Sequence, residues 1–259
     1  MIPTASGRFE VDTILALSTV EAKTLWRAKT PLIFFLALPV ILSLVLGPAI
    51  DQIQGTGLSG RPLIGFAVLF SYMTANYAGH AFYSEYWNGT WVRQAMLQPS
   101  RAAYVAGKLG PITLVGFLQL LVFVVVAAAL HGVPLTGTSL MLLPLLLMLS
   151  ASGAALGMVL FVLTNSMRVF SSLVYLVLIG FGSLGGTIAP VSGMPEPWRT
   201  AGMVTPHFWA MRGIEEVMFG QGNWMVVAQS TGVVLMQTAV LMLFGVALLN
   251  LRRQKLSEM

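Results

Sequence analysis

Apolar runs long enough to cross a lipid bilayer dominate this sequence. An α-helix needs about 20 mostly apolar residues to cross a hydrocarbon core of about 30 Å. Only 9% of the 259 residues are charged, whereas a soluble domain carries about a quarter. The sequence therefore predicts an all-α membrane protein, with residues 1–259 forming a single transmembrane domain. The six predicted transmembrane helices cover residues 32–50, 63–83, 109–130, 140–163, 169–189 and 226–251.

Residues 8–29 precede the first run and have the pattern of an amphipathic helix. Apolar side chains recur on one side and charged side chains on the other. We expect this helix to lie in the membrane interface before the chain turns inward at Pro31. The apolar side is formed by Val11, Ile14, Leu15, Ala22, Leu25 and Trp26, and the charged side by Asp12, Lys23 and Arg27.

A polar stretch, residues 84–108, separates the second and third runs. Within it, residues 88–98 have helical amphipathic spacing. Pro99 ends this helix, because proline disfavours helical geometry in the residue before it. We expect the helix to lie across the membrane surface or against a partner. Its apolar face consists of Trp91, Val92, Ala95 and Met96, and its polar face of Arg93, Gln94 and Gln98.

Basic residues are distributed unequally between the two predicted sides of the membrane. Because basic loops stay in the cytoplasm, we expect a multi-pass protein of the inner (plasma) membrane with both termini and residues 84–108 cytoplasmic. The cytoplasmic set is Arg8, Lys23, Arg27, Lys29, Arg93, Arg101, Lys108, Arg168, Arg252, Arg253 and Lys255, and the opposite set is Arg61, Arg199 and Arg212.

The external segment 190–224 interrupts the apolar pattern with four prolines but keeps scattered Trp, Met and Phe residues. This composition predicts short helices that dip into the outer membrane interface as a re-entrant segment. Glycines at helical spacing predict close helix packing elsewhere. The glycines assigned to packing are Gly153 and Gly157 in the fourth run, and Gly182 and Gly186 at the end of the fifth.

Polar residues at the end of the second run have two readings. Asn76, His80 and Glu85 follow one another at about one helical turn. They form either a proton or ion relay or a set of hydrogen bonds to neighbouring helices. Whether Asn76 and His80 line a path or only pack is left open by the sequence.

The sequence offers no set of residues for catalysis or metal binding. It has no cysteine, and its three histidines are too scattered for metal ligands. His207 precedes Glu215 and Glu216, but without a nucleophile it is better explained as orienting the re-entrant segment than as a catalytic base. No phosphate-binding loop Gly-x-x-x-x-Gly-Lys-(Ser/Thr) occurs. The net charge of +5 reflects topology rather than nucleic-acid binding.

Two motifs resemble those of the type-2 ABC exporter permeases, which include daunorubicin-resistance-like drug exporters. Tyr86, Trp87 and Trp91 depart from the usual pattern of the first motif. The first motif is formed by Glu85, Gly89, Thr90, Pro99, Arg101, Gly107 and Lys108, and the second by Pro206, His207, Trp209, Ala210 and Arg212.

The resemblance implies the membrane half of an ATP-driven exporter for a hydrophobic or amphipathic compound such as a drug, lipid or glycolipid. It implies two copies of a separate P-loop ATPase, which would hold ATP and Mg, and a second permease copy or a sister chain. It also implies a coupling helix that contacts the ATPase. We expect Trp91 to anchor this helix, because a buried aromatic side chain commonly dominates such an interface, and Glu85 to pair with a basic residue of the interfacial helix such as Lys23 or Arg27. The residues assigned to ATPase coupling are Glu85, Gly89, Thr90, Trp91, Arg93, Pro99 and Arg101.

Two other classes of function stay open from the sequence. One is a secondary transporter driven by an ion gradient, which should show inverted repeats and ionisable residues at mid-membrane. The other is a membrane-embedded enzyme, which needs several convergent ionisable or nucleophilic groups at membrane depth. His80 is almost the only ionisable group within the predicted spans, which counts against both.

Overall fold

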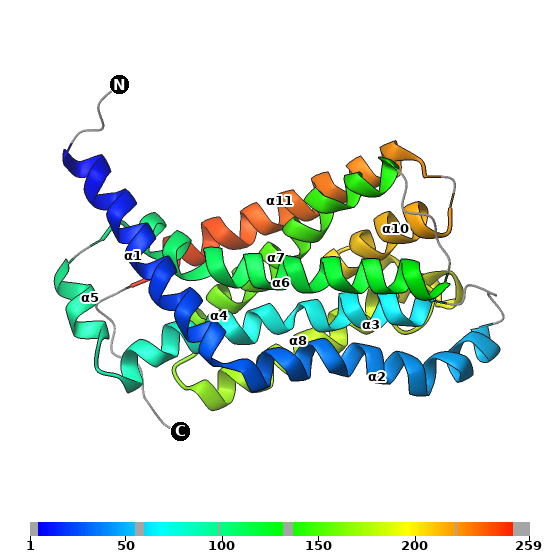
Figure 1. The fold of residues 1–259 in the computed structure, drawn as a ribbon, viewed down its shortest axis with the longest axis horizontal. Coiled ribbons are helices and arrows are strands. Elements are labelled where there is room, and N and C mark those ends of the chain that lie inside the picture. The colour runs from blue at the N-terminus through cyan, green and yellow to red at the C-terminus, as the bar shows by residue number, and fades with distance from the viewer. Residues whose placement is uncertain (1–4, 55–59, 98, 132–136, 221, 251–259) are drawn as a thin grey trace.

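A computed structural model describes residues 5–54, 60–97, 99–131, 137–220 and 222–250. All regular secondary structure in these residues is helical, which confirms the predicted all-α class. Long helices lie side by side along one axis, while α1 (Ala5–Arg27) crosses one end of the bundle at an angle (Figure 1). The short helix α5 (Trp91–Leu97) projects beyond that same end.

Within the described residues, five helices are long and apolar enough to cross a membrane. The second predicted span, residues 63–83, is divided at Tyr72 into two shorter helices that continue in the same direction. The six-span arrangement therefore stays a prediction, with five helices of sufficient length and one broken pair. The five are α2 (Lys29–Gln54), α6 (Arg101–His131), α7 (Leu142–Leu163), α8 (Met167–Leu184) and α11 (Trp224–Leu248), and the pair is α3 (Arg61–Ser71) and α4 (Met73–Trp87).

The break at Tyr72 lies against α7, the most buried of the candidate spans. The Tyr72 hydroxyl is 2.8 Å from Ser152 Oγ on α7, and Thr74 Oγ1 donates to the Ser71 carbonyl at 2.8 Å. Gly153 and Gly157 face this region, and a Cβ atom at either would overlap Thr74 or Ala75. A helix break at membrane depth is tolerated where neighbouring protein covers the backbone, and here α7 provides that cover.

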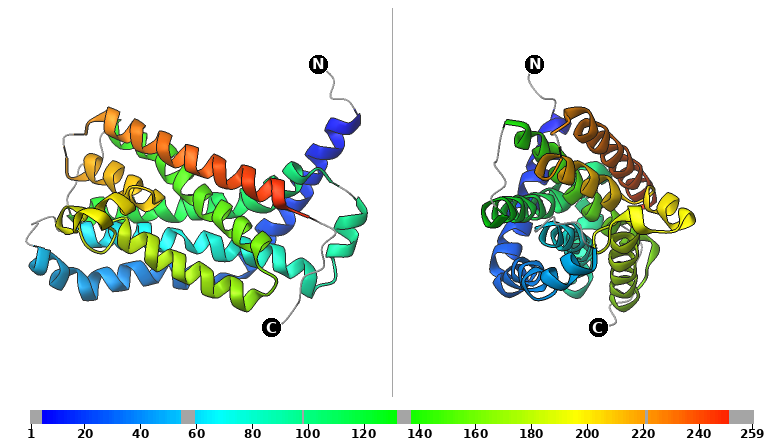
Figure 2. Two further views of the ribbon diagram at one scale, coloured as in Figure 1. Left: turned by 180° about the vertical axis from the view of Figure 1, so that it is seen from behind. Right: turned by 90° about the vertical axis from the view of Figure 1, so that its right-hand side faces the viewer.

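Several helix ends differ from those expected. Helix α6 begins at Arg101 rather than at residue 109. Residues 101–108 of the polar stretch therefore form the first turns of the helix that contains the third predicted span. Helix α8 ends at Leu184, where Gly185 and Gly186 turn the chain; Gly186 has a φ of 82°. The segment that follows, seen from two sides in Figure 2, contains short helices. They are the 3₁₀ turn η2 (Val191–Gly193), α9 (Glu196–Gly202) and α10 (Pro206–Met218); another 3₁₀ turn, η1 (Gly137–Met141), leads into α7.

Helix α1 turns only part of its predicted apolar side to the bundle. Helix α1 packs on α6, and Leu25 and Glu21 on this side are only 6% and 5% exposed. Val11, Leu15 and Trp26, assigned to the same apolar side as Leu25, are 54%, 60% and 76% exposed. Exposed apolar side chains of this size suit a helix that lies in a membrane interface.

The close approach of α3 to the turn after α8 gives a first testable prediction. A Cβ atom at Gly65 would overlap the Thr187 carbonyl oxygen, which belongs to the backbone and cannot rotate away. Gly65→Ala should therefore lower the free energy of unfolding by about 1–3 kcal/mol. Gly110→Ala in α6, where a Cβ meets nothing within 4 Å, should leave it unchanged or raise it by up to about 1 kcal/mol. Thermal unfolding of the purified variants in detergent measures both, and equal melting temperatures would contradict this packing.

Candidate functional site

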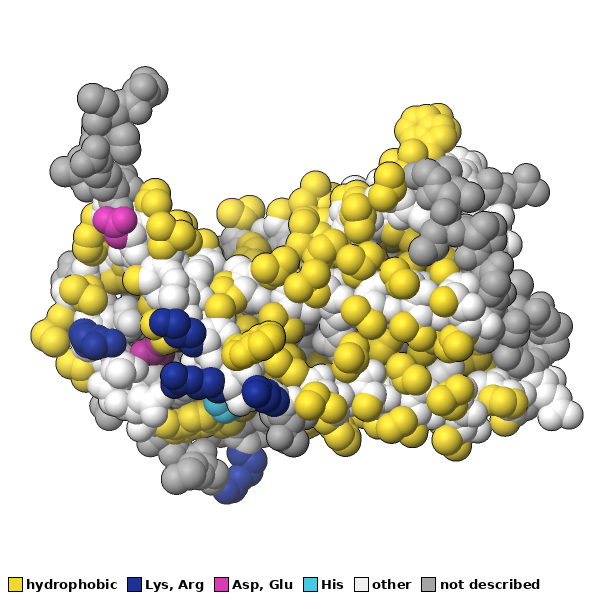
Figure 3. Space-filling model, in the orientation of Figure 1, with side chains coloured by type: hydrophobic (Ala, Val, Ile, Leu, Met, Phe, Trp, Pro, Cys, Tyr) yellow, Lys and Arg dark blue, Asp and Glu magenta, His cyan; other side chains and the backbone are white. Residues whose placement is uncertain are grey.

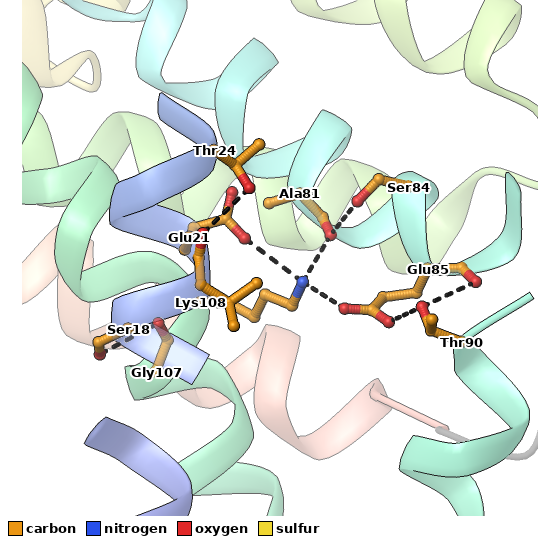
Figure 4. Close-up of polar contacts among 10 residues, drawn as sticks. Ser18, Glu21, Thr24, Ala81, Ser84, Glu85, Thr90, Gly107 and Lys108 are labelled. Carbon is orange, nitrogen blue, oxygen red and sulfur yellow. Dashed lines mark hydrogen bonds and ion pairs between the residues drawn. The ribbon is translucent and has the colours of Figure 1, made fainter. Parts of the chain in front are cut away.

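One buried lysine joins three helices at the end of the bundle that carries α1 and α5 (Figure 4). Lys108 Nζ, from α6, lies 2.5 Å from Glu85 Oε1 on α4 and 3.4 Å from Glu21 Oε2 on α1. It also donates a hydrogen bond to the Ala81 carbonyl at 3.0 Å. The three charged residues are 3%, 9% and 5% exposed respectively. We call Glu21, Glu85 and Lys108 the charged junction.

The charged junction contains two carboxylates and one ammonium group. Desolvation by burial raises the pKa of Glu21, and the nearby Glu85 adds to this, while Lys108 opposes it. A buried ionised group is tolerated only when paired charges and hydrogen bonds compensate for lost hydration. Both carboxylates therefore depend on Lys108 for their compensating charge, and the single ammonium group is divided between them.

Gly107 explains how α1 comes close enough to reach Lys108. A Cβ atom at Gly107 would lie 2.7 Å from Leu17 Cβ and 3.2 Å from the Ile14 carbonyl oxygen. Ser18 Oγ donates to the Gly107 carbonyl at 3.2 Å. In the first motif, Gly107 thus allows α1 to pack closely on α6, and Lys108 forms the ion pair with Glu21.

The expectation that Glu85 pairs with Lys23 or Arg27 is wrong. Glu85 pairs with Lys108, and both Lys23 and Arg27 are exposed. The reason is helical geometry: Lys23 lies about 200° around α1 from Glu21, on the opposite side. The sequence placed Lys108 in the motif but gave no sign that it would be buried.

Glu85 also shapes the turn between α4 and α5. Its Oε2 atom accepts a short hydrogen bond from the Thr90 hydroxyl, and its carbonyl accepts one from the Thr90 backbone N–H at 2.8 Å. Gly89 in this turn has a φ of 66°, a conformation that glycine adopts without steric cost. Three residues of the first motif, Glu85, Gly89 and Thr90, therefore fix where α5 begins.

Helix α5 is shorter than the predicted 88–98 and is rotated from the predicted orientation. Trp91 stacks on Tyr86 with ring centroids 5.7 Å apart, so it packs toward the bundle. Gln94, predicted on the polar face, is buried, whereas Val92, Met96 and Leu97 are 44%, 71% and 56% exposed. The outward face of α5 is therefore formed by Val92, Arg93, Met96 and Leu97.

The end of the loop is tied to the last long helix. Pro99 is buried, and Arg101 Nη1 donates to the Ala247 carbonyl on α11 at 2.9 Å. Basic side chains gather at this end of the molecule, while the body of the bundle is covered by apolar side chains (Figure 3). The Arg8 side chain and Arg252, Arg253 and Lys255 of the predicted cytoplasmic set lie outside the described residues.

At the opposite end, Arg61 holds the second motif in place. Its Nε lies 2.8 Å from Glu215 Oε1 on α10, and its Nη2 donates to the Gly186 carbonyl at 2.8 Å. Burial raises the pKa of Glu215 and Arg61 opposes this. Gly182 packs against Leu69 of α3 at the same end. The sequence used Arg61 only as a topology marker; its position directly before an apolar run was the available signal.

The remaining residues of the second motif hold α10 in place. His207 is fully buried against Tyr72, with ring centroids 4.2 Å apart; the Leu69 backbone faces it, but neither ring nitrogen reaches hydrogen-bond geometry. Trp209 Nε1 donates to the Met203 carbonyl at 2.7 Å, and the Arg212 guanidinium lies over the Trp209 ring. Pro206 opens α10, where Thr205 caps the helix by accepting from Phe208 N–H.

His80 is exposed and packs edge-on against Trp87, with ring centroids 5.1 Å apart. Its predicted companion Glu85 is committed to Lys108 and Thr90. Asn76 is half-buried. This geometry favours local packing for the polar residues of α4 over a relay.

Comparison with known protein families identifies one match. The family model described as ABC-2 type transporter matches residues 13–219, which include most of α1, the charged junction, α5 and the whole of α10. No curated protein matches the chain.

Proposed function

Because the chain belongs to the ABC-2 type transporter family, it is a multi-pass permease subunit of an ABC transporter, and we propose that it exports a hydrophobic or amphipathic compound using ATP. The outward face of α5 is the observation that supports this most strongly. A helix that projects beyond the bundle with exposed Val92, Met96 and Leu97 suits a cleft on a partner. That partner is a separate P-loop ATPase, which supplies ATP and Mg.

The proposed orientation puts α1, α5 and the end of α11 in the cytoplasm, in the plasma (inner) membrane. Positive charge supports it, because Lys23, Arg27, Arg93 and Arg101 lie exposed at this end and basic residues favour the cytoplasmic side. Two permease chains, as a homodimer or with a sister chain, and two ATPases make up the complete exporter.

The charged junction provides a route for movement from α5 into the bundle. Glu85 contacts Thr90 at the start of α5 and Lys108 on α6, and Lys108 contacts Glu21 on α1. A displacement of α5 therefore acts on three other helices through short polar contacts rather than through a flexible loop. This is the mechanical requirement for a subunit whose energy source is a separate protein.

An apolar cavity of about 330 Å³ supports the proposed chemical class of substrate. It lies beside the Tyr72 break and is lined almost entirely by apolar side chains. Most small-molecule sites are concave and mainly apolar with a few polar groups. Its lining includes Tyr72, Leu156, Phe181, Met236, Gln237 and Val240.

Substitution of the outward face of α5 tests the ATPase contact. We expect Val92→Glu combined with Met96→Glu to weaken binding of the ATPase by about 2 kcal/mol or more, because charge replaces the apolar centre of an interface. Copurification and substrate-stimulated ATP hydrolysis in nanodiscs measure the effect. The control is Leu15→Glu, which is also exposed but lies on α1 rather than on α5. Wild-type assembly of the double variant would rule out α5 as the contact.

Transport by the permease alone would distinguish a secondary transporter from the proposed ATP-driven exporter. The purified chain in liposomes should move no substrate under an ion gradient and should gain transport only with its ATPase and ATP. Gradient-driven transport without the ATPase would instead establish a secondary transporter.

A further inference from the structure

A cavity of about 660 Å³ lies between α1, α4 and α5, next to the charged junction. Its depth is polar, because Glu21, Glu85 and Lys108 all contribute to the lining. Apolar side chains flank this depth, among them Leu17, Val20 and Leu97. The cavity therefore combines buried charge with an apolar wall, which is the pattern expected for the polar end of an amphiphile.

Glu21 is the carboxylate in this cavity with the longer ion pair to Lys108. It is 5% exposed, and its Oε2 atom contacts Lys108 at 3.4 Å, the longer of the two ion pairs that Lys108 makes. Its other oxygen, Oε1, points away from Lys108 in Figure 4 and accepts no hydrogen bond from the described residues. The junction has two carboxylates for one ammonium, so a second cation with N–H donors would balance its remaining negative charge.

The rim of the cavity carries the opposite charge. Arg93, on the outward face of α5, lines the cavity and is exposed. A guanidinium group is suited to bind phosphate. Val20 and Leu97, 59% and 56% exposed, flank the opening with apolar surface. An acidic depth, a basic rim and an apolar flank match a ligand with an ammonium group, a phosphate and hydrocarbon chains in that order.

We propose that this cavity binds the headgroup of an aminophospholipid, with the primary ammonium on Glu21 and the phosphate on Arg93. The bilayer is the source, because α1 carries exposed Val11, Leu15 and Trp26 and so borders the lipid interface beside the cavity. The bound lipid completes the charge of the junction and packs α1 against α4 and α5. The site needs no ATPase, so its failure would leave the proposed transport function standing.

Lipid competition on the purified full chain tests the site. The protein is exchanged into micelles with equimolar phosphatidylethanolamine and phosphatidylcholine of identical acyl chains, and bound lipid is counted by native mass spectrometry. Wild type should retain phosphatidylethanolamine preferentially, because choline has no N–H donor. Glu21→Gln should reduce this preference roughly tenfold, the loss expected for one charge-assisted hydrogen bond. Arg93→Gln should reduce retention of both lipids and leave the preference, because both carry the phosphate.

Controls and contrary outcomes are defined by the same measurement. Glu10→Gln makes the same change at an exposed position of α1 and should bind as wild type does. Unchanged helical content by circular dichroism shows that Glu21→Gln is folded. Equal retention of the two lipids by wild type, or an unchanged preference in Glu21→Gln, overturns the proposal. If dodecylamine, which lacks a phosphate, binds at least as tightly as phosphatidylethanolamine and Arg93→Gln retains both lipids as wild type does, the phosphate contact is absent and the lipid assignment is overturned.

Discussion

Lys108→Met is expected to lower the free energy of unfolding by about 3–5 kcal/mol, the cost of removing one partner from a buried ion pair. Methionine fills a similar volume, so the loss comes from charge rather than from a cavity. Glu21 and Glu85 would remain buried without the ammonium that both contact. Thermal unfolding of the purified chain in detergent, compared with wild type, measures the change.

The pH dependence of this variant distinguishes charge from packing. Burial already raises the pKa of Glu21, with Lys108 opposing it, so removal of Lys108 raises that pKa further. A carboxyl group whose pKa is raised by folding stabilises the fold when protonated and loses that contribution as pH rises through its folded pKa. The deficit of Lys108→Met should therefore shrink as pH falls below neutrality. Adding Glu21→Gln to Lys108→Met should recover part of the deficit at pH 7.

Lys23→Met is the matched control, since Lys23 is an exposed cation two residues from Glu21. Its free energy of unfolding should lie within about 0.5 kcal/mol of the wild-type value, as for most surface substitutions. A Lys108→Met variant that also matches wild type, with no dependence on pH, would show that the charged junction does not form.

The fold class was predictable because each apolar run had a length and composition that leave few alternatives in a membrane. The break at Tyr72 was not, because tyrosine fits an apolar helix and no proline or glycine marks the site. Its cause lies in a distant segment, where Ser152, Gly153 and Gly157 of α7 receive the irregular backbone. Local pattern carries no information about such a contact.

The sequence indicated only the part of the site whose residues lie close together in the chain. Motif spacing brought Glu85, Gly89 and Thr90 together correctly, because they belong to one turn. Glu21 was missed, since its partner Lys108 is 87 residues away and only the packing of α1 on α6 unites them. The face of α5 was mistaken because Trp91 has a nearby partner in Tyr86, which amphipathic spacing alone cannot reveal.

Glu215→Ala is expected to destabilise the opposite end of the bundle by about 3–5 kcal/mol, because it leaves the buried Arg61 guanidinium without its carboxylate. Arg61 is 4% exposed and joins the start of α3 to α10 and to the Gly186 carbonyl. Loss of the ion pair should therefore lower the melting temperature and also loosen α10. Faster amide hydrogen exchange in α10 would show the loosening. Glu196→Ala is the internal comparison: it breaks an exposed pair with Arg199 on the neighbouring helix α9, a type of contact worth about 0–1 kcal/mol. Equal melting temperatures for Glu215→Ala and Glu196→Ala would mean that the Arg61 pair is no stronger than a surface contact, and that α10 is held by its apolar packing alone.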